Sequence, residues 1–237
     1  MATEQVPEQA SKGRAMARRM FQVLGNLALI GILLFVAAGQ PAWLWAWVYL
    51  GAGLALLVLN AIILLPRHGD LVSERGEIRE GTKGWDRAMI PVLLLTGLSM
   101  YVVAGLDERF GWSPDLPLWL HLLALVVMVM AQLGFVWAMS VNRFFAKTVR
   151  IQAERGHTVV SSGPYRFVRH PGYLCNLVTF PMAMLLLGSL WGLIAAAASA
   201  AAFIIRTALE DRTLQQELPG YRDYAQRVRY RLFPGIW

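Results

Sequence analysis

Residues 174–205 read LCNLVTFPMAMLLLGSLWGLIAAAASAAAFII, an apolar block without a single charged residue. A helix crosses the hydrocarbon core of a bilayer in about 20 residues, so the block is too long for one ordinary span. Gly188-Ser189-Leu190-Trp191-Gly192 offers a natural break inside it. We therefore expect a helical hairpin of about 174–187 and 190–207, the second helix continuing to about 216. Its first arm is short and is expected to tilt or to cross incompletely.

Four further apolar stretches precede this hairpin, at about 20–39, 42–65, 88–106 and 117–141. Apolar residues make up 57% of the chain and charged residues only 16%, outside the usual range of soluble globular proteins. The sequence therefore predicts an all-α fold: a polytopic membrane bundle of five to six transmembrane helices, with six preferred. The first apolar run is long enough to span, which favours a retained helix over a cleaved signal peptide.

The composition divides the chain into three regions. Residues 1–15 are polar and contain Pro7 and Gly13, so a flexible N-terminal tail is expected there. Residues 16–110 would hold the first three transmembrane helices. Residues 111–237 would form the functional core, with the last three predicted helices, a loop over 142–173 and a C-terminal segment over 217–237.

The 22 Lys and Arg residues predict the orientation. With six spans, 21 of them fall on one side of the membrane and Arg109 alone on the other. Because basic loops stay in the cytoplasm, we expect both termini and the loop 142–173 on the cytoplasmic side, at the inner membrane if the protein is bacterial. The net charge of +7 therefore suits contact with anionic membrane lipids rather than with nucleic acid.

The loop 142–173 is much longer than a simple connector between two spans. It ends in Gly163-Pro164-Tyr165-Arg166-Phe167-Val168-Arg169-His170-Pro171-Gly172-Tyr173. Pro171 disfavours a helical conformation at His170 and supplies a rigid turn just before the next span. Such a turn can hold an imidazole and backbone groups toward a ligand, although a histidine beside a proline is more often a structural cap.

The same loop gathers groups that a purine-containing cofactor needs. Gln152, His157, Tyr165 and Tyr173 together offer stacking faces, hydrogen-bond donors and acceptors. The alternative is a basic loop that faces lipid headgroups, with interfacial tyrosines.

Arg206 and Glu210 lie four residues apart on the last predicted span and share one face of it. The plain interpretation is an ion pair where the helix leaves the membrane. An arginine at the edge of a span that faces the bundle is costly unless it has a partner or a function, so both interpretations stay open. The segment 227–237 alternates cations with apolar residues, which suits anchoring at an anionic interface.

Several common catalytic motifs are absent from the sequence. There is no GxGxxG, no Walker lysine motif, no HExxH and no GxSxG, so Rossmann-type dinucleotide binding, ATP hydrolysis, zinc proteolysis and serine hydrolysis lack support. The single cysteine, Cys175, excludes an intrachain disulfide and a multi-cysteine metal site. No metal centre is expected.

These residues resemble the isoprenylcysteine carboxyl methyltransferase family, integral-membrane methyltransferases related to the phospholipid N-methyltransferases. The resemblance covers about residues 140–237, and the first two spans carry little signal. It rests on Gln152, His157-Thr158-Val159-Val160, Gly163-Pro164-Tyr165, Arg169-His170-Pro171-Gly172-Tyr173, Arg206, Glu210, Tyr221 and Tyr224.

The resemblance implies a pocket for S-adenosylmethionine, which becomes S-adenosylhomocysteine after methyl transfer, closed by the C-terminal segment. The implied cofactor-binding residues are Gln152, His157, Thr158, Val159, Val160, Tyr165, His170, Pro171, Gly172, Tyr173 and Glu210. Arg206 would bind the methyl acceptor, and Arg206 and Glu210 would act in catalysis. The chain departs from the family pattern at Cys175, where glycine is usual, and at Asp211, where a second glutamate is usual.

The expected function is therefore methyl transfer to a lipophilic or small acceptor at the membrane. Carboxylate O-methylation of a prenylcysteine-like substrate is favoured, and amine or phospholipid N-methylation is the variant. The rival interpretations are an NADPH-dependent membrane reductase of the sterol type and a non-enzymatic scaffold or lipid-binding protein. No obligate protein partner is evident from the sequence.

Overall fold

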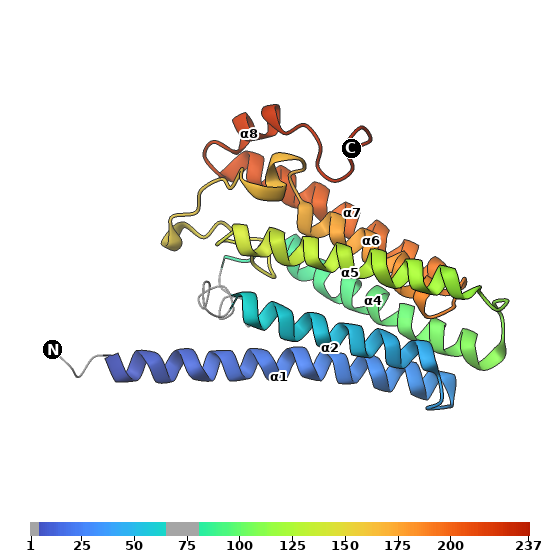
Figure 1. Ribbon diagram of the computed structural model, residues 1–237. Coiled ribbons are helices and arrows are strands. Elements are labelled where there is room, and N and C mark those ends of the chain that lie inside the picture. The colour runs from blue at the N-terminus through green and yellow to red at the C-terminus, as the bar shows by residue number, and fades with distance from the viewer. Residues whose placement is uncertain (1–4, 65–80) are drawn as a thin grey trace.

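A computed structural model describes residues 5–64 and 81–237, with side chains for 21–63 and 81–237. Every regular element in these residues is helical (Figure 1). The helices are α1 (Gln5–Ala38), α2 (Leu44–Leu64), α4 (Gly84–Phe110), α5 (Leu118–Val141), α6 (Pro171–Leu186), α7 (Gly192–Glu217) and α8 (Tyr221–Arg227), with the short 3-10 helices η1 (Ala153–Arg155) and η2 (Gly163–Arg166). The predicted all-α class is confirmed.

Five of the described helices (α1, α2, α4, α5 and α7) are long and apolar enough to cross a bilayer. Large apolar side chains point outward along them, among them Leu95, Val126 and Ile194, each more than half exposed. Such surfaces are rare on soluble monomers and are suited to lipid. The chain is therefore a polytopic integral-membrane protein. With 16 residues, α6 is shorter and rises only about 24 Å, against about 30 Å of hydrocarbon core.

The N-terminal region differs from the prediction. Residues 5–15, expected in a flexible tail, belong to α1, which runs without a break into the first span. The segment contains several good helix formers, and Pro7 stands in the first turn of the helix, where proline is tolerated. Residues 65–80, which belong to the connection between the predicted spans 42–65 and 88–106, lie outside the described residues.

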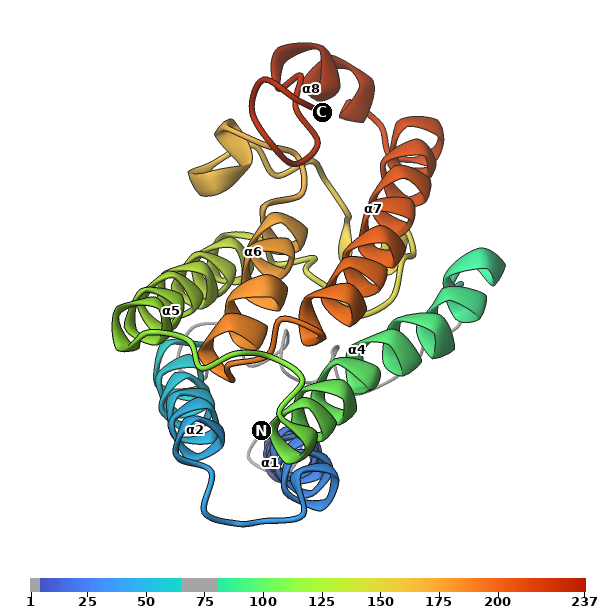
Figure 2. The same cartoon turned by 90° about the vertical axis from the view of Figure 1, so that its right-hand side faces the viewer.

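These five helices and the shorter α6 pack side by side in a ring (Figure 2). Around it, α1 packs on α4, α4 on α7, α7 on α6, α6 on α5, and α2 closes the circuit between α5 and α1. The N-terminal end of α1, the start of α4, the loop after α5 and the end of α7 all lie at one end of this bundle, left in Figure 1. We call this the basic end.

The opposite end of the bundle is closed by apolar and polar packing. Buried residues such as Leu34, Met100 and Met184 form the core there. Gly105 permits close contact of α4 with α1, because a Cβ on it would come within 2.6 Å of the Cβ of Ala37. The buried carboxylate of Asp107 accepts hydrogen bonds from the hydroxyls of Ser113 and Ser189.

Candidate active site

A cavity of about 470 Å³ lies at the basic end, within the range of about 300–1,000 Å³ that is common for small-molecule sites. Side chains from α1, α4, α5, α6, α7 and α8 and from the loop after α5 line it. Among the lining residues are His157, Thr158, Val159, Val160, Tyr165, His170, Pro171, Gly172, Tyr173, Arg206 and Glu210. The structure therefore brings together all but one of the site residues expected from the sequence.

The turn at Pro171 forms one wall of the cavity. His170 has φ −125° and ψ 62°, outside the helical region, and α6 begins at Pro171, as the sequence predicts for a residue before proline. Gly172 allows the start of α6 to approach the loop, because a Cβ on it would lie 2.7 Å from Cζ of Phe145. The first turn of α6 thus packs directly against the ring of Phe145, which also lines the cavity.

Tyr173 connects this wall to α7. Its hydroxyl donates to Oε2 of Glu210 at 2.5 Å, and its ring stacks on that of His170 with centroids 5.8 Å apart. The guanidinium carbon of Arg206 lies 5.6 Å from the centroid of the Tyr173 ring. The predicted shared face of Arg206 and Glu210 is therefore present and turned toward Tyr173.

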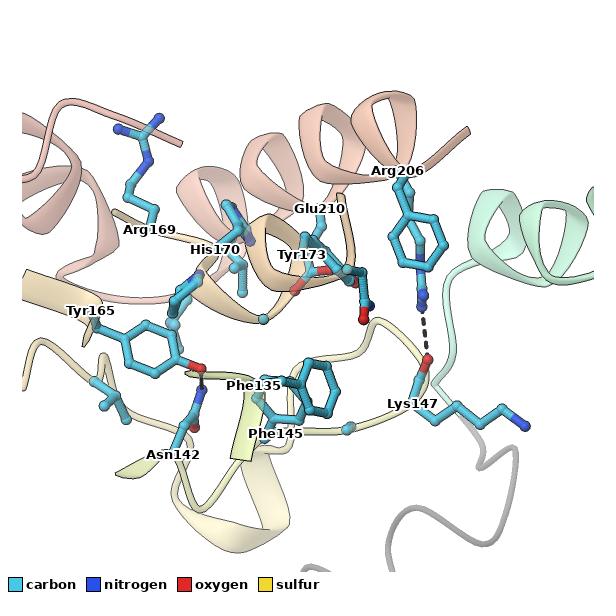
Figure 3. A pocket seen from close by; sticks show the side chains of 18 of the residues that line it. Phe135, Asn142, Phe145, Lys147, Tyr165, Arg169, His170, Tyr173, Arg206 and Glu210 are labelled. Atoms are coloured by element: carbon cyan, nitrogen blue, oxygen red, sulfur yellow. Dashed lines mark hydrogen bonds between the residues drawn. The ribbon is translucent and has the colours of Figure 1, made fainter. Parts of the chain in front are cut away.

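Arg206 and Glu210 do not pair with each other in the described structure. Arg206 instead donates from Nε to Oδ1 of Asp86 at 2.8 Å and from Nη2 to the carbonyl oxygen of Lys147 at 2.7 Å. Figure 3 shows Arg206 above Lys147 on one side of the cavity and Tyr165 on the other. The carboxylate of Glu210 remains available to the cavity, with one hydrogen bond from Tyr173.

The far side of the cavity is organised by Tyr165. Its hydroxyl accepts a hydrogen bond from Nδ2 of Asn142 at 3.1 Å (Figure 3). Its carbonyl oxygen accepts a hydrogen bond from the Tyr224 hydroxyl at 2.7 Å. Burial raises the pKa of Tyr224 and of Tyr221, so both phenols stay protonated and act as donors. The segment after α7 is thereby tied to the loop and covers the cavity.

Asp211 supports this cover from behind the cavity and is not one of its lining residues. Its carboxylate, fully buried, accepts from Nε of Arg169 at 2.7 Å, Nε of Arg231 at 2.8 Å and the Tyr221 hydroxyl at 3.1 Å. Nε2 of His170 lies 3.3 Å from the same carboxylate. Asp211 thus connects the loop, α7, α8 and the C-terminal segment.

Arg169 strengthens the same connection. Its Nη1 donates to the carbonyl oxygens of Val228 and Arg229, each at 2.8 Å, and its backbone N–H donates to that of Tyr230. In Figure 3 its guanidinium points away from the labelled residues around Tyr173. Although Arg169 lines the cavity, its guanidinium binds Asp211 and the backbone of the C-terminal segment that covers the cavity.

His157 lines the cavity as a neutral imidazole. Burial, together with the positive charges of Arg150 and Arg155, lowers the pKa of His157 to about 4. Its Nδ1 lies 3.3 Å from the backbone nitrogen of Gln152 and accepts from it, and its ring packs on Phe144 with centroids 4.5 Å apart. A neutral histidine does not repel a cationic ligand.

Gln152 is the expected site residue that the structure does not bring to the cavity. Its side chain is buried, with Nε2 donating to the carbonyl oxygen of Phe144 at 2.8 Å and Oε1 accepting from Nη1 of Arg155 at 2.6 Å. A long polar side chain inside a loop can satisfy backbone groups as readily as a ligand, and here it does the former. Gln152 therefore holds the loop that carries His157.

Cys175, where the family usually has glycine, lies in the contact between α5 and α6. A Cβ on Gly134 of α5 would approach its Sγ to 3.0 Å. The small residue in this close contact is thus on α5, which leaves room for the thiol on α6. Cys175 does not line the cavity.

Residues 119–216 match the model of the isoprenylcysteine carboxyl methyltransferase (ICMT) family. The chain is thus similar to the ICMT family over this C-terminal region. The matched region holds the loop, the Pro171 turn, Arg206 and Glu210, whereas α1, α2, α4 and the C-terminal cover lie outside it. This match indicates a membrane methyltransferase in the broad sense.

A curated relative is the cobalt-zinc-cadmium resistance protein CzcN of Cupriavidus metallidurans. It is 39% identical over 85 residues, which are 33% of this chain and 37% of the relative. The chain thus matches only about a third of the length of this relative. Within the described residues, no three His, Cys, Asp or Glu side chains are grouped so as to hold a metal ion.

Two groups of residues at the site were not predicted from the sequence. Phe135, Asn142, Phe145 and Lys147 line the cavity from the ICMT-matched region, but they look like ordinary residues of a span or of a basic loop. Asp86 lies outside that region, 120 residues from its partner Arg206, and one sequence offers no signal for such a pair. In the sequence, Asp86 is recognisable only as an acidic residue just before an apolar stretch.

Proposed function

We propose that the protein transfers a methyl group from S-adenosylmethionine to a lipophilic acceptor, from a cavity on the cytoplasmic side of the membrane. One observation carries the proposal: in a chain similar to the ICMT family over its C-terminal region, a single cavity gathers the His157–Tyr173 loop and the Arg206/Glu210 face of α7.

The residues present fit the cofactor. Its amino-acid end carries an ammonium group, for which the carboxylate of Glu210, oriented by Tyr173, is a suited acceptor. Its adenine needs stacking faces and neutral polar partners, which Tyr165, His157 and Asn142 offer. When bound, the cofactor supplies a methyl group activated by a positively charged sulfur.

The acceptor is proposed to lie between Arg206 and the apolar part of the cavity. That part is lined by Ile90, Leu93 and Leu94 of α4 and by Phe203 of α7, which favours an acceptor with a hydrocarbon portion. Arg206 would orient an acceptor carboxylate by a charge-assisted hydrogen bond, and a carboxylate needs no general base. An amine acceptor would have to lose a proton, for which Glu210 and His170 are the candidate acceptors.

The chain's own contribution to the rate is alignment. Arg206, Glu210 and Tyr173 are held on helices by short hydrogen bonds, and α8 with the C-terminal segment covers the cavity. Fixed groups in a site shielded from water can account for a large part of a catalytic effect without any acid or base.

The test is cofactor binding and methyl transfer by the detergent-purified protein. Calorimetry should show binding of S-adenosylmethionine or S-adenosylhomocysteine, and a radiolabelled assay should show transfer to an S-farnesyl cysteine derivative, phosphatidylethanolamine or a small alkyl thiol. Glu210→Gln should weaken cofactor binding about 10- to 100-fold, the usual range for a hydrogen bond to a charged group.

Glu217→Gln is the matched control, since this glutamate of the same helix pairs with Lys83 and does not line the cavity. It should bind the cofactor as the wild type does. Arg206→Ala should reduce methyl transfer far more than cofactor binding. Folded wild-type protein that binds neither cofactor form would contradict the proposal, and loss of cofactor binding in Arg206→Ala would contradict the role given to Arg206.

A further inference from the structure

Asp86 is a buried acid in the first turn of α4, outside the ICMT-matched region. Its side chain is fully inaccessible to solvent. Its two carboxylate oxygens accept from two different parts of the chain: Oδ1 from Nε of Arg206 at 2.8 Å and Oδ2 from the backbone N–H of Val149 at 2.7 Å. Asp86 therefore holds both α7 and the loop after α5.

The hydrogen bonds of Arg206 to Asp86 and to the loop leave one edge of its guanidinium available. Nε is held by Asp86, and Nη2 by the carbonyl oxygen of Lys147, which lies two residues before Val149. Among the described residues no hydrogen-bond acceptor engages Nη1, and Arg206 lines the cavity. The guanidinium is thus fixed in its plane by two acceptors and has one edge left for a third.

The pair is not explained by stability alone. Buried ion pairs often add nothing to stability compared with apolar residues of similar volume, because two charges must be desolvated. A planar guanidinium held at two corners, however, presents its remaining N–H groups in a defined direction. Such a direction matters for a reaction that depends on alignment.

We propose that Asp86 is a positioning residue for methyl transfer: it fixes Arg206 so that Nη1 is offered to the acceptor. This inference rests on the proposed function. It assigns to α4 and the N-terminal part of the chain a role in acceptor alignment, while cofactor binding depends on α6, α7 and the loop.

Asp86→Asn tests the inference at constant shape. A carboxamide has one oxygen, so it can accept from Arg206 or from Val149 but not from both, and its NH2 group meets the donor that remains. The cofactor-contacting residues are unchanged. We expect calorimetry to find one S-adenosylhomocysteine site per folded chain with Kd within about twofold of wild type, while kcat/KM for the acceptor falls about 100-fold.

Asp107→Asn is the matched control, because Asp107 is an equally buried acid of the same helix at the other end of the bundle. Its kinetic constants per cofactor site should equal those of the wild type. A purely structural role of Asp86 would instead lower the number of cofactor sites and leave kcat and KM per site unchanged, which would overturn the inference.

A double variant separates action through Arg206 from an independent effect. In an Arg206→Gln background, Asp86→Asn should cause no further loss of kcat/KM, because residues that act as one unit are not additive. Multiplying losses would overturn the inference. If Asp86→Asn does not fold, Asp86→Glu keeps the charge but displaces the guanidinium, and wild-type kinetics in that variant would overturn it equally.

The activity of the wild type shows whether a negative result concerns the proposed function or only the role of Asp86. A wild type that binds no cofactor and methylates none of the three acceptor probes overturns the proposed function and this inference with it. An active wild type whose Asp86→Asn variant is equally active per cofactor site overturns this inference alone.

Discussion

At the residue scale, two adjacent acids on α7 have opposite tasks. Glu210 lines the cavity, and among the described side chains only Tyr173 donates a hydrogen bond to it. Asp211, one position on, is fully buried and accepts from both Arg169 and Arg231. Because neighbouring helix residues point about 100° apart, one acid meets the cavity and the other meets the C-terminal cover. An aspartate at position 211, in place of the longer glutamate, therefore affects the stability of the C-terminal cover and not the contact with a ligand.

Asp211→Asn should therefore destabilise the protein. It leaves the buried guanidinium of Arg169 without its counter-charge, and breaking such a pair typically costs about 3–5 kcal/mol. Thermal unfolding in detergent should show a clearly lower Tm. Glu217→Gln, which removes a half-exposed acid of the same helix, should change stability by no more than about 1 kcal/mol. Equal Tm values for the two variants would contradict the role of Asp211.

At the scale of elements, the contact between α5 and α6 sets the position of the Pro171 turn. Gly134 on α5 faces Cys175 on α6. Cys175 lies just after Gly172 and Tyr173, which line the cavity. Any bulk added at this contact must push the start of α6 away from α5. Packing of these two helices is therefore connected to the geometry of the cavity wall.

Gly134→Ala should destabilise the protein by about 1–3 kcal/mol, the usual range for overpacking, because the new Cβ would lie 3.0 Å from Sγ of Cys175. Cys175→Ala removes the sulfur and keeps a good helix former. The double variant should recover most of the Tm lost in Gly134→Ala, as measured by thermal unfolding. Additive losses in the double variant would show that the two side chains do not meet.

Much of the element scale was predictable from sequence, and the reason is the lipid. Helices α2 and α5 expose apolar residues along their length, so hydropathy alone locates them within a few residues. The extension of α1 to Gln5 was not predictable in this way, because its polar N-terminal part lies outside any apolar run.

The same contrast holds in the site. His170, Pro171 and Tyr173 were recognisable because they are polar or conformationally restricted residues beside a span. The pairs Asp86–Arg206 and Arg169–Asp211 were not, because they join residues 120 and 42 positions apart. A local pattern contains no information on which distant charge compensates a buried one.

At the scale of the whole molecule, the bundle has two unlike ends. The basic end carries the cavity and its cover, and the other end carries the short turn after α1 and the loop over 111–117. The charge bias predicts that the basic end is cytoplasmic.

Single cysteines in a Cys175→Ala background test this orientation. Asp115, in the loop over 111–117, and Arg227, the last residue of α8, are both exposed. The loop and α8 lie at opposite ends of the bundle (Figure 1). In intact cells or spheroplasts, a membrane-impermeant maleimide should label Asp115→Cys at once and Arg227→Cys only after permeabilisation. The reverse pattern would show that the basic end faces outward.

The shortness of α6 has a consequence for how an acceptor of the proposed class reaches the cavity. Because α6 begins at the cavity and is about 6 Å shorter than the hydrocarbon core, we expect the cavity floor to lie below the level of the lipid headgroups when the other end of α6 reaches the opposite headgroups. Lifting a hydrocarbon chain into water costs about 0.8 kcal/mol per CH2 group. An acceptor whose tail stays in the bilayer can present its polar end to Arg206 without that cost, so turnover should depend on the thickness of the membrane around the protein.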